Sequence, residues 1–228
     1  MEAFSQWFSQ LQLEKLIEMV LSATACLVCI VLHELCHGLA ALWMGDDTAR
    51  RSGRLTLNPL KHIDLVGLLM LFTVRFGWAK PVPVNMRRFR HPKSGMALTA
   101  LAGPFGNFLI ALLLTPCYAA AVVWYQVTEI QAVYYLAIFL MMTITVSIGL
   151  MVFNLIPIPP LDGSKILFSV LPSKWYKKLM KYERYGSIVL VLLLYFGILD
   201  TPLSFLRNEI QQFIFTVAGD PVVRLLIG

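Results

Sequence analysis

The chain has 228 residues, of which 58% are hydrophobic and 14% charged, with a formal net charge of +6. A soluble globular domain has about 25% charged residues, so this chain has too few charges to cover a water-facing surface. The composition predicts an all-α polytopic membrane protein with one compact body, because a helix satisfies its own backbone hydrogen bonds inside lipid.

Four apolar runs are candidates for membrane-spanning helices. A helix needs about 20 apolar residues, at roughly 1.5 Å each, to cross the hydrocarbon core. The runs are Met19–Gly45, Met96–Tyr125, Val133–Phe153 and the shorter Ile188–Leu199, which can be extended through Phe205. We therefore expect about four to six membrane helices.

Two histidines and a glutamate interrupt the first run, in "HELCH" from His33 to His37. Each helical residue turns about 100°, so His33 and His37 differ by about 40° in direction and can bind one tetrahedral metal ion. Glu34 lies beside such an ion but is poorly placed as a ligand, so it can instead take a proton from an attacking water. Polar residues satisfied by other helices are the alternative interpretation. Inside a span, however, ionisable residues indicate a functional site.

Cysteines also lie in the predicted spans. Cys26, Cys29, Cys36 and Cys117 are all placed there, which favours small buried residues over a disulfide framework. Cys29 precedes His33 by one helical turn on the same face, so its approach to the site is left open.

Basic residues predict the orientation of the spans. Ten Lys or Arg lie between Gly45 and Ser94 and six between Lys165 and Arg184, whereas the link around Glu129 has none. By the positive-inside rule, both basic segments face the cytoplasm and the N-terminus lies outside. The charge then reflects topology and contact with anionic lipid. No nucleic-acid partner is expected, because no aromatic–basic platform or groove motif accompanies the charges.

The segment between the first two spans contains short alternating stretches. "GRLTLN" and "KPVPVN" alternate apolar residues with polar residues or proline, and "DLVGLLMLFTVRFGW" has barely a dozen residues before Arg75. These stretches predict a short strand-rich or re-entrant element on the cytoplasmic side. His62 and His91 lie in the basic segments and are interpreted as ordinary solvent or interfacial histidines.

A third metal ligand is expected from "NLIPIPPLDG", Asn154–Gly163. Three prolines, Pro157, Pro159 and Pro160, forbid a continuous helix there, and broken backbone at membrane depth must be packed in protein or line a watery cavity. Gly163 allows a sharp turn beside Asp162. The alternative role for Asp162 is to cap the following helix.

These residues resemble a known family, the site-two proteases, which are zinc metalloproteases that cut within membranes. The resemblance covers about Val31 to Val170. It rests on "HELCH", "GDDTARRSGRLTLNPLKHID", "GWAKPVPVN", "AGPFGN" and "NLIPIPPLDG", in the family's order. It implies Zn²⁺ held by His33, His37 and Asp162, with Glu34 as general base.

The resemblance has further implications. It implies that Asn107 and Asn154 border the active site or the substrate strand. The chain is similar to the compact subgroup, without a PDZ or nucleotide-sensing domain. We therefore expect a single integral-membrane protease domain over 1–228, with a catalytic core of about 19–172 and additional C-terminal membrane or interfacial helices over 173–228.

The expected function is zinc-dependent intramembrane endopeptidase activity, in the cytoplasmic membrane of a bacterium. Expected partners are a single-pass membrane protein or membrane peptide as substrate and the lipid bilayer, and a homo-oligomer is left open. An exposed strand edge in the cytoplasmic element would clamp an unwound substrate by backbone pairing. The alternatives are a membrane transporter, which predicts paired charges on several spans and internal repeats, and a catalytically silent metal-binding membrane protein, which the intact Glu34 disfavours.

Overall fold

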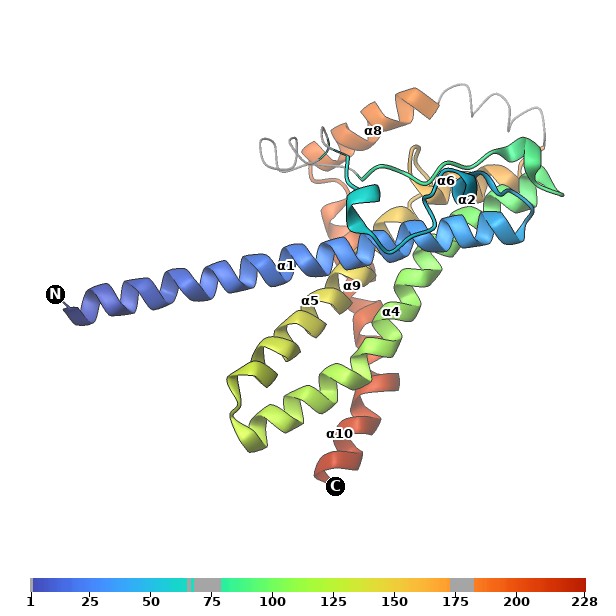
Figure 1. The fold of residues 1–228 in the computed structure, drawn as a ribbon. Coiled ribbons are helices and arrows are strands. Elements are labelled where there is room, and N and C mark those ends of the chain that lie inside the picture. Colours follow the sequence, from blue (N-terminus) through green and yellow to red (C-terminus); the bar gives the residue numbers. More distant parts are fainter. Residues whose placement is uncertain (1, 65–66, 68–78, 173–182) are drawn as a thin grey trace.

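The fold is known from a computed structural model, which describes residues 2–64, 67, 79–172 and 183–228 (Figure 1). The described residues are mostly helical, so the expected all-α class is confirmed. In chain order the elements are α1 (Glu2–Trp43), α2 (Thr48–Arg51), η1 (Pro59–Lys61), η2 (Met86–Arg88), α4 (Pro92–Thr128), α5 (Gln131–Asn154), α6 (Asp162–Val170), α8 (Glu183–Tyr195), α9 (Asp200–Ile214), η3 (Phe215–Gly219) and α10 (Asp220–Ile227).

Four helical segments of the described chain are long and apolar enough to cross a membrane. They are Gln12–Trp43, Pro92–Thr128, Gln131–Asn154 and Asp200–Ile227. The first three contain most of the first three predicted runs, which confirms a membrane protein with spans at those places.

The predicted fourth span, Ile188–Leu199, is wrong. Its first part lies in α8, whose 13 residues cover about 20 Å at 1.5 Å per residue, which is less than the hydrocarbon core. Gly197 then adopts a left-handed backbone, φ +66, which ends the run as glycine commonly does after a helix. A new helix begins at Asp200, and the fourth long apolar segment follows from there.

Three of the long helices form the body that carries the site. α4 and α5 are joined by a tight link in which Glu129 has a left-handed backbone, φ 54, so the two helices return alongside each other. α1 crosses this pair and contacts both members, and α6 packs against α4 (Figure 1). The segment α9–η3–α10 packs against α4 and α5, so it supports the pair from the side.

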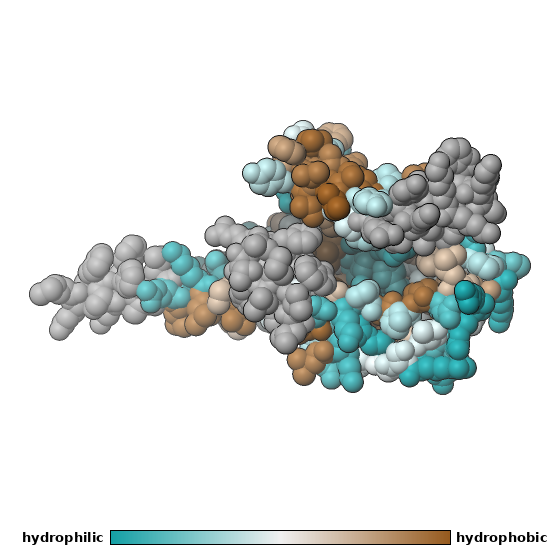
Figure 2. All heavy atoms as spheres, turned by 90° about the horizontal axis from the view of Figure 1, so that it is seen from above, coloured by the Kyte–Doolittle hydropathy of each residue, from teal (hydrophilic) through white to brown (hydrophobic). Residues whose placement is uncertain are grey.

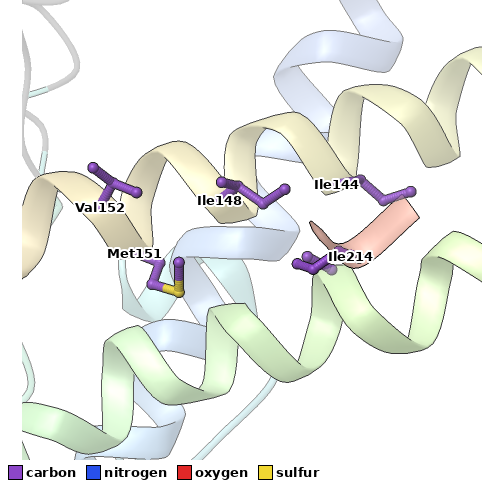
Figure 3. Close-up of a cluster of buried hydrophobic side chains, with 6 residues drawn as sticks. Ile144, Ile148, Met151, Val152 and Ile214 are labelled. Carbon is purple, nitrogen blue, oxygen red and sulfur yellow. The ribbon is translucent and has the colours of Figure 1, made fainter. Parts of the chain in front are cut away.

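One cluster of buried apolar side chains lies along α5. Ile144, Ile148, Met151 and Val152 recur at helical spacing on α5 and meet Ile214 of α9 (Figure 3). Ala111 of α4 completes the cluster. In lipid, such helices are held by close packing, because the apolar tails outside are as hydrophobic as the core.

The strand-rich element expected on the cytoplasmic side is not supported. In the described residues, the segments that flank it contain one isolated antiparallel bridge, between Ile63 and Ala79. The physical reason lies in "KPVPVN": Pro81 and Pro83 have no N–H to donate to a ladder, and the N–H of Val82 is donated to a side chain. Residues 65–66 and 68–78, the middle of the expected element, lie outside the described residues.

Hydrophilic side chains gather at the end of the molecule where α1 ends and α4 begins (Figure 2). This end contains the basic residues of the loop between those helices. The lipid-facing sides of the long helices instead expose large apolar residues, such as Leu113 and Val20. The distribution agrees with an apolar body that carries one polar end.

Shortening a side chain in the α5 cluster should cost stability. We expect Ile148→Ala to lower the free energy of unfolding by about 2–5 kcal/mol, because Ile148 is fully buried and the surroundings collapse only partly into the cavity. Thermal unfolding of the purified protein in detergent measures this change. Leu113→Ala is the control, since Leu113 is 68% exposed; equal losses from both variants would contradict the assigned core.

Candidate metal centre

Three side chains from two helices converge inside the protein. His33 and His37 lie one turn apart on α1, and Asp162 is the first residue of α6. All three are buried, and one ligand atom from each lies within 4.8 Å of the others. The sequence separated Asp162 from His33 by 129 positions, and the fold places their side chains in contact.

The spacing of the three atoms fits a zinc ion. The Nε2 atoms of His33 and His37 are 3.0 Å apart, and Asp162 Oδ2 lies 3.3 Å from the first and 3.0 Å from the second. Ligands bound at about 2.0–2.1 Å in tetrahedral directions are roughly 3.3 Å apart. Two imidazole nitrogens and one carboxylate oxygen are also a usual donor set for catalytic zinc, which leaves one position open.

The carboxylate of Asp162 is held in its ionised form. Burial by itself raises the pKa of this carboxyl, but hydrogen bonds with His33 and His37 and the charge of Lys165 together lower the pKa below its ordinary value. Lys165 Nζ donates to the second carboxylate oxygen, Oδ1, at 3.3 Å. Metal binding requires a deprotonated ligand, so the surroundings prepare Asp162 for that role.

Helix α4 holds the far side of each imidazole. His37 Nδ1 lies 2.7 Å from the backbone carbonyl oxygen of Thr99, and His33 Nδ1 lies 3.1 Å from the side-chain nitrogen of Asn107. A histidine that binds metal through Nε2 carries its proton on Nδ1 and donates it to an acceptor. The Thr99 carbonyl is such an acceptor, and it fixes the ring of His37.

The Asn107 amide supplies an independent indication of a metal. As placed, its nitrogen faces His33, and its buried oxygen Oδ1 has no hydrogen-bond partner. The two ends of an amide are assigned from the hydrogen-bond network. Turning the amide over lets Oδ1 accept the Nδ1 proton that zinc binding would leave on His33. The unpartnered oxygen thus gains a partner when His33 carries its proton on Nδ1, as a histidine that binds metal through Nε2 does.

Gly103 lets α4 approach the two imidazoles closely. A Cβ atom on Gly103 would collide with both the His33 and the His37 ring. Glycine is therefore required where the helix backbone forms a wall of the site. In the "AGPFGN" segment, this glycine therefore borders the metal ligands.

The expected turn at Gly163 is not present. Gly163 lies in the first turn of α6, and its backbone does not have a left-handed conformation. Its lack of a side chain serves a close approach instead, because a Cβ atom would collide with the carbonyl oxygens of Leu155 and Ile156. The N-cap of α6 is Leu161, so the carboxylate of Asp162 is directed to the histidines.

The other residues singled out by the sequence lie in different surroundings. Glu34 accepts a hydrogen bond from the Val82 N–H through Oε2, at 2.7 Å. Asn154, at the end of α5, donates its side-chain N–H to the carbonyl of Leu150 in its own helix, at 2.9 Å. The thiol of Cys29 points to α5, where it lies 3.4 Å from the Thr143 carbonyl and 3.4 Å from the Ser147 hydroxyl. All four cysteines are free.

The interpretation of His62 as a solvent or interfacial residue is wrong. Its side chain is fully buried, and Nε2 lies 2.9 Å from the Thr56 carbonyl. The loop folds back over the ring, which the basic composition of the segment did not indicate. His91 is exposed and precedes α4.

A side chain at Gly163 should weaken zinc binding. We expect Gly163→Ala to lower the zinc affinity by about tenfold or more, because displacing the start of α6 moves Asp162 and supporting interactions of this kind contribute 10–100-fold. Competition with a chromogenic chelator measures this affinity. Gly149→Ala is the matched control, since no described heavy atom lies within 4 Å of a Cβ there. Equal affinities would show that the close contact at Gly163 does not position Asp162.

Comparison with known proteins agrees with this centre. The profile of peptidase family M50 matches residues 119–197, which include Asp162. YwhC of Bacillus subtilis (strain 168) is 37% identical over 173 residues, covering 73% of this chain and 76% of that protein. Rip2 of Mycolicibacterium smegmatis is 30% identical over 172 residues, covering 74% of this chain and 64% of that protein. Both are named "Putative zinc metalloprotease".

No solved structure matches the chain. A membrane zinc metalloprotease is indicated by the relatives, by the converging His–His–Asp group and by the long apolar helices. The chain belongs to peptidase family M50, the site-two proteases, and is a membrane metalloprotease that uses zinc.

Proposed function

We propose that the protein is an intramembrane endopeptidase that cleaves membrane-spanning segments of other proteins or membrane peptides. One observation carries this proposal: the His33, His37 and Asp162 ligand atoms converge at a point bordered by two helices long enough to cross the membrane, α1 and α4. His33 lies fourteen residues after Met19, where the apolar part of α1 begins, and ten residues before the end of α1 at Trp43, or about 21 Å and about 15 Å at roughly 1.5 Å per residue. A site at that depth meets peptide bonds inside the bilayer.

The residues have separate roles in the proposed reaction. His33, His37 and Asp162 would hold the metal. Zinc, when bound, supplies Lewis-acid chemistry at the substrate carbonyl and at the attacking water. Glu34 takes the proton of that water on its carboxylate and later gives it to the nitrogen of the leaving amine. Asn107 and the Thr99 carbonyl keep the two imidazoles in one tautomer and orientation.

The substrate is proposed to be a single-pass segment whose helix opens near the site. A helical peptide bond is hydrogen-bonded and shielded, and unwinding it in lipid exposes groups that lipid cannot satisfy. Gly, Pro or Asn in the segment would ease this step. The broken chain from Asn154 to Asp162, with three prolines, is a candidate partner for the opened strand. Substrate contacts by Asn107 and Asn154 remain part of the proposal.

Orientation in a bacterial cytoplasmic membrane is proposed from charge. The basic loop between α1 and α4 and the basic segment after Asp162 would face the cytoplasm, with the N-terminus outside. The hydrophilic end seen in Figure 2 is compatible with this arrangement. Water would then reach the site from the cytoplasmic side, to which this orientation assigns the ends of α1 and α5 and the start of α4.

The roles of base and ligand should separate in two variants. We expect Glu34→Gln to keep about one zinc per chain and to lose peptide-bond cleavage, because the lost group is the base. Asp162→Ala should lose tight zinc together with activity. Metal analysis and a peptide-cleavage assay on the same preparations measure both. Full activity in Glu34→Gln, or stoichiometric zinc with activity in Asp162→Ala, would contradict the assignment.

Cysteine labelling tests the orientation. In a background without the four native cysteines, Ser52→Cys in the basic loop should react with a water-soluble reagent only from the cytoplasmic side. Thr128→Cys, at the other end of α4, should react only from outside. Both positions are exposed. The opposite sidedness would overturn the proposed topology, whatever the protein cleaves.

A further inference from the structure

One contact of Glu34 is not explained by the proposed mechanism. Its Oε2 accepts a hydrogen bond from the backbone N–H of Val82 at 2.7 Å. Val82 lies 48 residues further along the chain, in "KPVPVN", and is buried. A backbone donor placed on a catalytic carboxylate fixes its direction and leaves the other oxygen for a proton transfer.

The segment that supplies this donor is anchored on both sides of Val82. On one side, Arg54 Nη2 donates to the carbonyl oxygens of Lys80 at 2.5 Å and Pro81 at 3.1 Å. On the other side, the N–H of Asn85 is donated to Asp46 Oδ2 at 2.5 Å. The peptide that carries the Val82 N–H includes the Pro81 carbonyl, so Arg54 and Glu34 hold the two ends of one peptide group.

Both anchors are buried charged residues. Arg54 is 7% exposed and Asp46 is fully buried. In the described part of the chain, no carboxylate forms an ion pair with Arg54, whose Nη2 is used for backbone carbonyls. Burying a guanidinium without an acidic partner is costly. Burial of Arg54 is explained if the protein needs the backbone that this side chain binds to stay in one position.

Packing holds the same segment against α1. Gly38 lies next to His37, and a Cβ atom there would come within 3.3 Å of the Val82 side chain. The nearest atom to such a Cβ is on Leu55, so the absence of a side chain at Gly38 lets Leu55 lie against α1, with Val82 packed beside it. Pro83 disfavours a helical backbone at Val82, and Pro81 has a fixed φ of its own, so the segment has little freedom to turn the N–H away from the carboxylate.

We propose that Val82, held by Arg54 and Asp46, is a positioning residue whose backbone N–H orients Glu34 for proton transfer. This inference rests on the proposed function, because it assigns a support to its general base. The segment acts through Glu34 and not through the metal ligands or the substrate. The alternative, in which the segment is a docking strand for substrate, is an outcome that the experiment distinguishes.

The test removes the N–H by a single substitution. Val82→Pro deletes the donor and keeps an extended backbone, and Val84→Pro places a proline in the same segment without touching that N–H. Both are compared with the wild type in liposomes. The probe is a single-pass apolar peptide with a Gly-Pro pair at mid-depth and a fluorophore–quencher pair. We expect Val82→Pro to lower kcat by about 10–100-fold with zinc retained, and Val84→Pro to stay within about twofold of the wild type.

Two further measurements separate orientation from structure and from substrate binding. In the Glu34→Gln background, which binds without cleaving, Val82→Pro should leave the Kd of the probe unchanged. A double-mutant cycle combines Val82→Pro with Glu34→Asp, whose shorter side chain cannot reach the same donor. Because both substitutions remove the same contact, the kcat of the double variant should be no lower than that of the less active single variant. Arg54→Ala should reproduce the loss of kcat, with Arg51→Ala as its exposed control.

The outcomes that overturn the inference are distinct. Equal losses from Val82→Pro and Val84→Pro, or losses that multiply in the cycle with Glu34→Asp, show that the N–H does not act through Glu34. A weaker Kd for Val82→Pro in the Glu34→Gln background makes the segment a substrate-docking strand. If the wild type itself cleaves nothing, or Glu34→Gln cleaves fully, the proposed function fails and this inference fails with it.

Discussion

The structure depends on one requirement: three ionisable side chains buried in an apolar helical body must satisfy one another. A single buried polar group without a partner costs several kcal/mol in hydrocarbon. The three side chains are partners for one another, since His33, His37 and Asp162 each have a ligand atom within 4.8 Å of the others. The geometry that satisfies them is also the geometry that binds zinc, so folding and metal binding are linked.

Helix α4 fixes the orientation of the two histidine rings in the site. It supplies no ligand, yet it carries Asn107 and Thr99 against the two rings and a glycine at Gly103 where the rings need space. Its tight packing on α5 fixes it relative to the rest of the body. Changes in α4 would therefore alter the zinc site without touching a ligand, which explains why a segment of small residues accompanies the metal motif in the sequence.

The sequence predicted the parts of the site that depend on side-chain chemistry. "HELCH" and the aspartate after the proline-rich turn have side chains with a recognisable role, and their convergence follows the resemblance to the family. The Thr99 carbonyl and the Val82 N–H were missed because backbone groups have no sequence signature. The sequence alone does not show which glycine of "AGPFGN" lies against the imidazole rings of His33 and His37.

The fold was predicted where hydropathy is continuous and missed where it is broken. The run Ile188–Leu199 stands out by composition, but Gly197 ends it. The real fourth long helix begins at Asp200 and includes charged residues such as Arg207 and Glu209, which lower its apparent hydropathy. In the described part of the expected strand-rich element, a local reason opposes strands, since proline removes the donors that a ladder needs.

The loop between α1 and α4 contributes to the site as well as carrying basic charge. A base on a helix next to metal ligands has a flexible side chain with several rotamers, and side-chain freedom of this size is worth up to about 1.5–2 kcal/mol. The hydrogen bond from the Val82 N–H to Oε2 restricts this side chain, and its donor lies outside the helices. Under the proposed topology, the basic loop that orients the spans would also hold the base, and Arg54 is the residue at which the two roles meet.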